Sequence, residues 1–136
     1  MKIVLDTNVL VSAFLNPRGR PADVLNLIIN DEAVICFDDR IMNEYKEVLS
    51  RYIFGFNISD VNSVISYFKH SGERVDPSPL DIKLNDPDDA MFYEVMIASG
   101  ASYLVTGNIR HFNVLNDNRI VVPADFLREY FKSRRL

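Results

Sequence analysis

Four short runs of mostly apolar residues divide the chain. They cover residues 3–5, 33–37, 102–106 and 120–122. None of the runs alternates strictly between apolar and polar positions, and this pattern favours strands that are buried on both faces of a parallel sheet. We therefore predict a central parallel sheet of about four to five strands.

The segments between these runs carry apolar residues at helical spacing. After Pro21, which suits a first helical turn, Val24 and Ile28 recur four residues apart. Asp38 and Asp86 stand where N-cap residues are expected. Helices are predicted from about Thr7 and over 21–30, 38–52, 59–70, 86–100 and 123–131, with a polar loop after 70 marked by Gly72, Pro77 and Pro79. Because strands alternate with helices, residues 1–136 are predicted to form a single three-layer α/β/α domain.

Composition narrows the class of protein. The chain has 136 residues, 48% of them hydrophobic, and a formal net charge of −4. The net charge argues against a general nucleic-acid-binding surface. One cysteine, Cys36, cannot build a disulfide framework or a thiolate metal site, which predicts a reducing, cytoplasmic environment. No apolar run has the length of a membrane span, and the first residues predict a strand rather than a signal peptide.

Asp6 is the first residue with candidate chemistry. It follows the predicted strand 3–5, and ligands of open α/β sheets bind outside the carboxyl ends of the strands. A carboxylate there, followed by Thr7 and Asn8, can hold a metal or accept a proton. The alternative is that Asp6 only caps the helix that begins near Thr7.

Other acids are predicted to meet Asp6 at this edge. Glu44 lies early in the helix after the second strand, and Asp86 and Asp89 are spaced i, i+3 at the start of a later helix. Asn108 follows the strand 102–106. Hard cations such as Mg²⁺ prefer oxygen ligands, and several gathered carboxylates repel one another unless a cation offsets the repulsion.

Four segments resemble, in order, the motifs of the PIN domain family. They are VLDTNVL at 4–10, NEYKEVL at 43–49, DPDDAMF at 86–92 and GASYLVTGN at 100–108. Each motif is weak alone, but the ordered match spans residues 1 to about 126. Within this family, the chain is similar to the VapC-type toxins of toxin–antitoxin systems. The resemblance implies a PIN-like fold and an endoribonuclease that depends on Mg²⁺ or Mn²⁺ and cleaves RNA.

The resemblance also implies roles for individual residues. Asp6, Glu44 and Asp89 would be the catalytic, metal-binding acids, and Asp86 or Asp88 could share the third role. Many family members carry an Asp at or shortly after the position of Asn108, whereas this chain has no acid there until Asp117. An Asn lends a carbonyl oxygen but no charge, so the resemblance implies one firmly held metal and a second that is held weakly or only with substrate.

Supporting roles are predicted for further residues around these acids. Thr7, Asn8, Asp88 and Thr106 are expected to orient the acids or bind metal water. Arg18, Arg20 and His111 are candidate contacts to RNA phosphates. Each of these residues also has an ordinary reading as a cap, a turn or a solvated side chain.

Two rival functions remain open from the sequence. A phosphatase or receiver-like domain also places an Asp after a strand, but phosphatases usually carry a second Asp two residues later, where this chain has Asn8. A PIN-like scaffold that binds RNA or a protein without cleaving it is the second rival, because the fourth acid is missing.

Two helices are predicted to carry more large apolar residues than the sheet needs. The residues are Val64, Ile65, Tyr67, Phe68, Phe126, Leu127, Tyr130 and Phe131. An apolar excess on a small domain marks a partner surface, so we expect a homodimer with two-fold symmetry. If the toxin resemblance holds, an antitoxin helix would fill an apolar groove of this protein.

Overall fold

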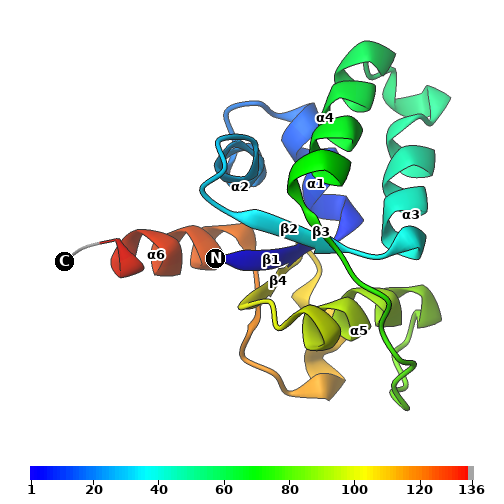
Figure 1. Cartoon of the computed structure of the whole chain (residues 1–136), viewed down its shortest axis with the longest axis vertical. Coiled ribbons are helices and arrows are strands. Elements are labelled where there is room, and N and C mark those ends of the chain that lie inside the picture. Colours follow the sequence, from blue (N-terminus) through cyan, green and yellow to red (C-terminus); the bar gives the residue numbers. More distant parts are fainter. Residues whose placement is uncertain (135–136) are drawn as a thin grey trace.

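The computed structural model describes residues 1–134 and has a five-stranded, fully parallel sheet at its centre (Figure 1). The strands are β1 (Lys2–Leu5), β2 (Val34–Phe37), β3 (Glu73–Arg74), β4 (Tyr103–Val105) and β5 (Ile120–Val121). Their order is β3-β2-β1-β4-β5, so β1 is the middle strand. Ile3 pairs with Ile35 of β2 on one side and with Tyr103 of β4 on the other. The predicted parallel sheet is confirmed.

Helices cover both faces of the sheet, which confirms the three-layer prediction. One layer contains α1 (Thr7–Leu15), α2 (Arg20–Ile29), α3 (Asp39–Leu49) and α4 (Ile58–Ser71). The other contains α5 (Ala90–Ser99) and the 3₁₀ helix η3 (Ile109–Leu115), as Figure 1 shows. The last helix, α6 (Pro123–Ser133), packs against α2 and β4. Among residues 1–134, no helix combines the length and the apolarity that crossing a membrane would require.

The middle strand is buried on both faces, as its continuous apolar run predicts. Ile3, Val4 and Leu5 have no exposed surface. Tyr45 of α3 is equally buried, and its hydroxyl donates a 2.6 Å hydrogen bond to the carbonyl of Leu5. This bond fixes α3 against the end of β1, where the first candidate acid follows.

The edge strand β3 lies in the predicted polar loop and was not expected from the sequence. Glu73 pairs with Cys36 and Arg74 pairs with Phe37 of β2. The strand has only two polar residues, so no apolar pattern signals it. Gly72 permits the approach, because a Cβ there would lie 2.5 Å from the carbonyl oxygen of Phe68 and 2.7 Å from that of Ile35.

The structure also differs from the sequence prediction at two helix boundaries and in one segment for which no element was predicted. The helix expected over 38–52 ends at Leu49, and a short 3₁₀ helix, η1 (Tyr52–Phe54), follows it. Tyr52 is fully exposed, so no buried face extends α3 that far. The 3₁₀ helix η2 (Pro87–Asp89) precedes α5. The last residue of α5 is Ser99, and Gly100, with a φ of 69°, is the expected left-handed C-cap. Residues 109–115, for which no element was predicted, form η3.

The apolar residues that suggested a homodimer are mostly core residues. Ile65, Phe68, Phe126, Leu127 and Tyr130 are buried, and Val64 and Tyr67 are partly buried against the core. Only the side chain of Phe131 in this set is largely exposed, at 55%. The predicted apolar excess is therefore wrong for most of the set, and the homodimer stays a prediction.

Candidate functional site

Asp6 leaves β1 at the carboxyl edge of the sheet and is 6% exposed. The hydroxyl of Thr106, just past β4, donates a 2.7 Å hydrogen bond to Asp6 Oδ2, and Asn8 Nδ2 lies 3.4 Å from the same oxygen. Asp6 occupies the N-cap position of α1, but its side chain accepts no capping hydrogen bond. The shortest hydrogen bond to the Asp6 side chain therefore comes from Thr106 beyond β4 and not from the backbone of the first turn of α1.

The loop after β4 orients the donors around Asp6. The backbone N–H of Asn108 donates to Thr106 Oγ1 over 3.0 Å, which leaves the Thr106 proton directed at Asp6. Asn8 Oδ1 accepts a 3.0 Å hydrogen bond from the N–H of Gly107. The ends of β1 and β4 are thus joined by neutral groups. The carboxylate of Asp6 accepts its hydrogen bonds from neutral side chains and not from a lysine or arginine.

Glu44 approaches the same edge from α3. Its carboxylate accepts a hydrogen bond from the hydroxyl of Thr7, the first residue of α1. Glu44 is partly buried, because α1 and α3 pack together there. The hydroxyl of Thr7 therefore positions Glu44, as that of Thr106 positions Asp6.

Asp89 comes from the opposite helical layer, at the start of α5, and is 9% exposed. His111 of η3 places Nδ1 3.2 Å from Asp89 Oδ2. Asp86 and Asp88 are both exposed, and Asp86 caps η2 by accepting a 3.0 Å bond from the N–H of Asp88. Of the three clustered acids, Asp89 is therefore the one whose side chain is buried. We call Asp6, Glu44 and Asp89 the site acids.

The site acids repel one another. Burial raises the pKa of Asp6, against the lowering effect of the Thr106 hydrogen bond, and the charge of Asp89 raises it further. Burial also raises the pKa of Glu44, with added repulsion from Asp6. The pKa of Asp89 is raised by burial and by Asp86, while His111 opposes the shift. The charges of the three acids therefore act on one another across the sheet edge.

The donor chemistry of these residues fits a hard divalent cation. Carboxylate and amide oxygens are the ligands that Mg²⁺ and Mn²⁺ prefer, and a cation would offset the repulsion that raises the three pKa values. As the side chains stand, residues 1–134 contain no group of three or more His, Cys, Asp or Glu already arranged to hold a metal. The carboxylates would have to be drawn together on binding.

The predicted arginine contacts lie apart from the site acids. Arg18 and Arg20 are exposed in and after the link between α1 and α2. Arg20 borders a hollow of about 450 Å³ against α6, together with Leu127 and Phe131. Within residues 1–134, neither arginine forms an ion pair with a site acid.

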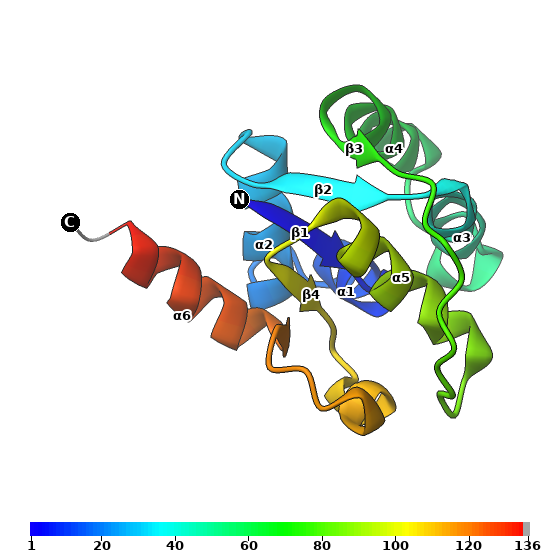
Figure 2. The same cartoon turned by 60° about the horizontal axis from the view of Figure 1, so that its bottom comes forward.

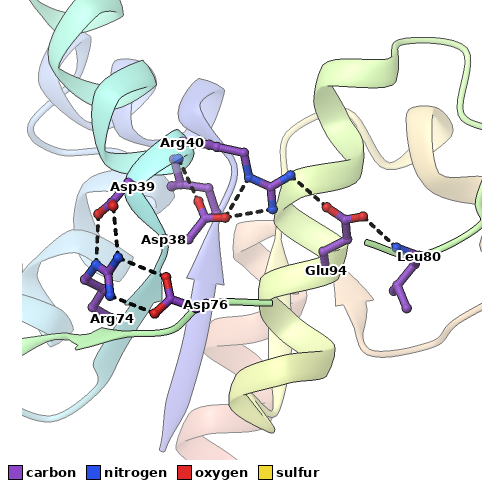
Figure 3. A network of polar contacts seen from close by, with 8 residues as sticks. Asp38, Asp39, Arg40, Arg74, Asp76, Leu80 and Glu94 are labelled. Carbon is purple, nitrogen blue, oxygen red and sulfur yellow. Dashed lines mark hydrogen bonds and ion pairs between the residues drawn. The ribbon is translucent and has the colours of Figure 1, made fainter. Parts of the chain in front are cut away.

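A second charged group at this edge was not anticipated from the sequence. Asp38, after β2, accepts a 3.0 Å capping bond from the N–H of Ile41, which confirms the predicted cap. Arg40 joins Asp38 to Glu94 of α5 (Figure 3): its Nη2 lies 2.7 Å from Asp38 Oδ2 and its Nη1 lies 2.8 Å from Glu94 Oε1. We call these three residues the Arg40 bridge. Only the cap was visible in the sequence, because Arg40 and Glu94 lie far apart along the chain.

Comparisons with known proteins agree with the fold. A family profile described as PIN domain matches residues 2–110. An uncharacterized protein of Methanocaldococcus jannaschii is 25% identical, and the match covers 97% of this chain and 93% of that protein. A chain in the crystal structure of VapBC2 from Rickettsia felis, solved with a DNA fragment from their promoter, superposes with a TM-score of 0.58. It is 22% identical, with 89% of this chain and 97% of that chain covered.

Proposed function

The chain belongs to the PIN domain family, and we propose that it is a metal-dependent endoribonuclease. One observation carries the proposal: three partly or fully buried carboxylates converge at the carboxyl edge of the sheet with raised pKa values. Among the described residues, no Lys or Arg forms an ion pair with any of them. Such an arrangement is costly unless a cation binds.

The proposed roles follow the contacts. Asp6, Glu44 and Asp89 would hold Mg²⁺ or Mn²⁺, with Asp86 and Asn108 as further oxygen donors. Thr106 and Thr7 would keep the Asp6 and Glu44 carboxylates oriented by hydrogen bonds to one oxygen of each. When bound, the ion supplies Lewis-acid stabilisation of charge on the phosphate and lowers the pKa of water.

Other residues would support the metal ligands. Asn8 would hold the β1 and β4 ends together, and Asp88 would orient the ion's outer ligands. No side-chain nucleophile is needed for this reaction class, because water attacks the phosphodiester.

The proposed substrate is RNA, contacted through its phosphates. His111 contacts Asp89 through Nδ1 and its side chain is 47% exposed, so Nε2 is the ring nitrogen left for a phosphate oxygen. Arg18 and Arg20, both exposed, would contact phosphates farther along the strand. Contacts of this kind position the backbone and carry no base specificity.

We also propose a protein partner. The VapBC2 structure contains a complex, and by analogy this chain would bind a small antitoxin whose amphipathic helix occupies an apolar groove.

A homodimer in isolation is proposed as well, with exposed Phe131 at its interface. Light scattering at micromolar concentration tests the dimer, because a mass of 15.6 kDa at every concentration would contradict it. The buried, unpaired Cys36 supports a cytoplasmic location.

A second function has an observation in its favour. Asn108 brings no charge at a position where the PIN resemblance implies an acid, and the carboxylates are not already arranged as a metal cage. A scaffold that binds RNA or a protein without cleaving it would need neither an acid at position 108 nor a metal cage.

RNA cleavage during a metal titration separates the two functions. The wild-type protein should cleave RNA with Mg²⁺ or Mn²⁺ and not with EDTA. Asp89→Asn should reduce cleavage by more than about 100-fold, since outer residues of metal sites alone are worth 10–100-fold. Asp23→Asn, which neutralises an exposed acid of α2, is the matched control and should leave cleavage unchanged. Metal-independent RNA binding without cleavage would favour the scaffold.

A further inference from the structure

The Arg40 bridge joins α3, which carries Glu44, to α5, which directly follows Asp89. Arg40 lies in the first turn of α3, one turn before Glu44. Its Nη1 donates to Glu94 Oε1 over 2.8 Å, and Glu94 lies in α5, the helix that Asp89 precedes. The α3 and α5 helices cover opposite faces of the sheet (Figure 1), so the bridge passes around the sheet's carboxyl edge.

Both carboxylates of the bridge are buried and fixed by the backbone. The side chains of Asp38 and Glu94 are 6% and 7% exposed. The N–H of Ile41 donates to Asp38, and the N–H of Leu80 donates to Glu94 over 2.8 Å. The guanidinium of Arg40 is therefore held at two sides by groups that cannot move independently of β2, α3 and α5.

The Leu80 contact extends the bridge to the segment before the acidic turn. This segment runs from β3 to η2 and passes alongside α5 (Figure 2). It ends at Asp86, the cap of η2, three residues before Asp89. One arginine thus connects the helix of Glu44 with both chain segments that flank Asp89.

Sheet pairing alone does not set the distance between Glu44 and Asp89. Strand pairing fixes the end of β1 and therefore Asp6, but Glu44 and Asp89 project from different helical layers. Their mutual repulsion would widen the gap. A planar arginine that binds two carboxylates in a defined fork is suited to keep α3 and α5 from moving apart, so that the two acids stay close enough to close on a cation.

We propose that Arg40 is a positioning residue that sets the separation of Glu44 from Asp89 and thereby the affinity for the divalent cation. The inference rests on the proposed metal-dependent function. It makes a prediction opposite to simple electrostatics. Removing a positive charge near the acids should strengthen cation binding by Coulomb attraction, whereas the loss of positioning should weaken it.

Mn²⁺ binding to purified Arg40→Met, measured by isothermal titration calorimetry, tests the inference. We expect affinity about 10-fold weaker than wild type, in the range known for outer residues of metal sites. Arg74→Met is the matched control. It removes an arginine of similar exposure that pairs with Asp39 and Asp76 but does not reach α5, and its affinity should stay within about twofold of wild type.

Two further readouts separate positioning from a purely structural role. Excess Mn²⁺ should restore RNA cleavage in Arg40→Met but not in Asp6→Asn, because only the former keeps its ligands. Arg40→Lys, which retains the charge without the fork, should bind Mn²⁺ with intermediate affinity, and it carries the test if Arg40→Met does not fold. A folded Arg40 variant with unchanged or tighter Mn²⁺ binding would overturn the inference.

The outcomes for this inference and for the proposed function can be told apart. If wild type binds Mn²⁺ and cleaves RNA while Arg40→Met and Arg40→Lys bind equally well, only the positioning role fails. If wild type neither binds Mn²⁺ nor cleaves RNA, the proposed function fails and the positioning role falls with it.

Discussion

The site acids and the acids of the Arg40 bridge lie at the same edge of the sheet in opposite surroundings. Asp38 and Glu94 share a guanidinium at 2.7–2.8 Å. Asp6 and Glu44 receive hydroxyl hydrogen bonds, and Asp89 contacts an imidazole. The burial of Asp6 and Asp89 is similar to that of the bridge acids, so the difference lies in the counter-charge and not in solvent access.

This difference separates a structural use of acids from a functional one. Leaving buried carboxylates without a cation costs free energy, and folds tolerate such cost mainly at functional sites. The chain has arginines at this edge, but it places Arg40 and Arg74 on neighbouring acids. Hydrogen bonds from Arg74 lower the pKa of Asp39, whereas the pKa of each site acid is raised.

The largest expected effect comes from neutralising a site acid. Asp6→Asn should reduce metal-dependent RNA cleavage by more than about 100-fold, beyond the range for outer residues of metal sites. In EDTA the same variant should melt at a higher temperature than wild type, because one repelling charge is removed while the Thr106 contact can remain. Thermal unfolding followed by circular dichroism checks the second result. A clearly lower melting temperature would assign Asp6 a structural role.

Neutralising a bridge acid should change stability in the opposite direction. Asp38→Asn keeps a good N-cap but weakens the charged hydrogen bonds to Arg40, so the free energy of unfolding should fall by about 1–2 kcal/mol. Urea unfolding measures this change. Arg51→Met breaks an exposed pair with Glu47 and should leave the free energy of unfolding nearly unchanged. Equal losses in both variants would remove the distinction between the bridge and an ordinary surface pair.

A smaller effect is expected in the pH dependence of the metal-free protein. The folded-state pKa values of the site acids are raised, so the folded state binds more protons than the unfolded state just above their ordinary values of 3.8 and 4.5. Stability should therefore fall as pH rises through this region, and Asp6→Asn should flatten the decline. Urea unfolding in EDTA at a series of pH values measures the slope.

Asp117 provides the control of opposite sign. Hydrogen bonds from Arg119 hold the pKa of Asp117 far below its ordinary value of 3.8. Its contribution to stability is therefore present above that value and is lost as pH falls below it. Asp117→Asn should remove stability at neutral pH and leave the slope above pH 4 unchanged. A wild-type slope that Asp6→Asn leaves intact would contradict the raised pKa of Asp6.

The sequence predicted the parts of the fold that rest on apolar patterning. The four runs became strands β1, β2, β4 and β5. Asp38 and Gly100 cap as expected, whereas Asp86 caps the short helix η2 and not α5. The strand β3 was missed because it consists of two polar residues. It forms where Gly72 lets the chain lie close to β2, and this tertiary contact has no local sequence signal. The apolar faces of α4 and α6 were misassigned because periodicity does not distinguish a core from a partner surface.

Some features of the candidate site could likewise be predicted from the sequence, and others could not. Motif order pointed to Asp6, Glu44 and Asp89, and topology placed them at one edge. The sequence did not rank Asp89 above Asp86 and Asp88, whereas burial does. It also offered no route to the His111–Asp89 contact or to the pairing of Arg40 with Glu94, because both depend on how α5 packs beside η3 and α3.

The most direct test of the central claim is the melting temperature of wild-type protein in EDTA and in increasing Mg²⁺ or Mn²⁺. If the site acids lack a counter-charge that a cation supplies, metal at about 100-fold above its dissociation constant should add roughly 2.7 kcal/mol and raise the melting temperature by several degrees. Asp6→Asn should lose most of that rise, and the control variant Asp23→Asn should retain it. A wild-type melting temperature that does not respond to either metal would contradict the account.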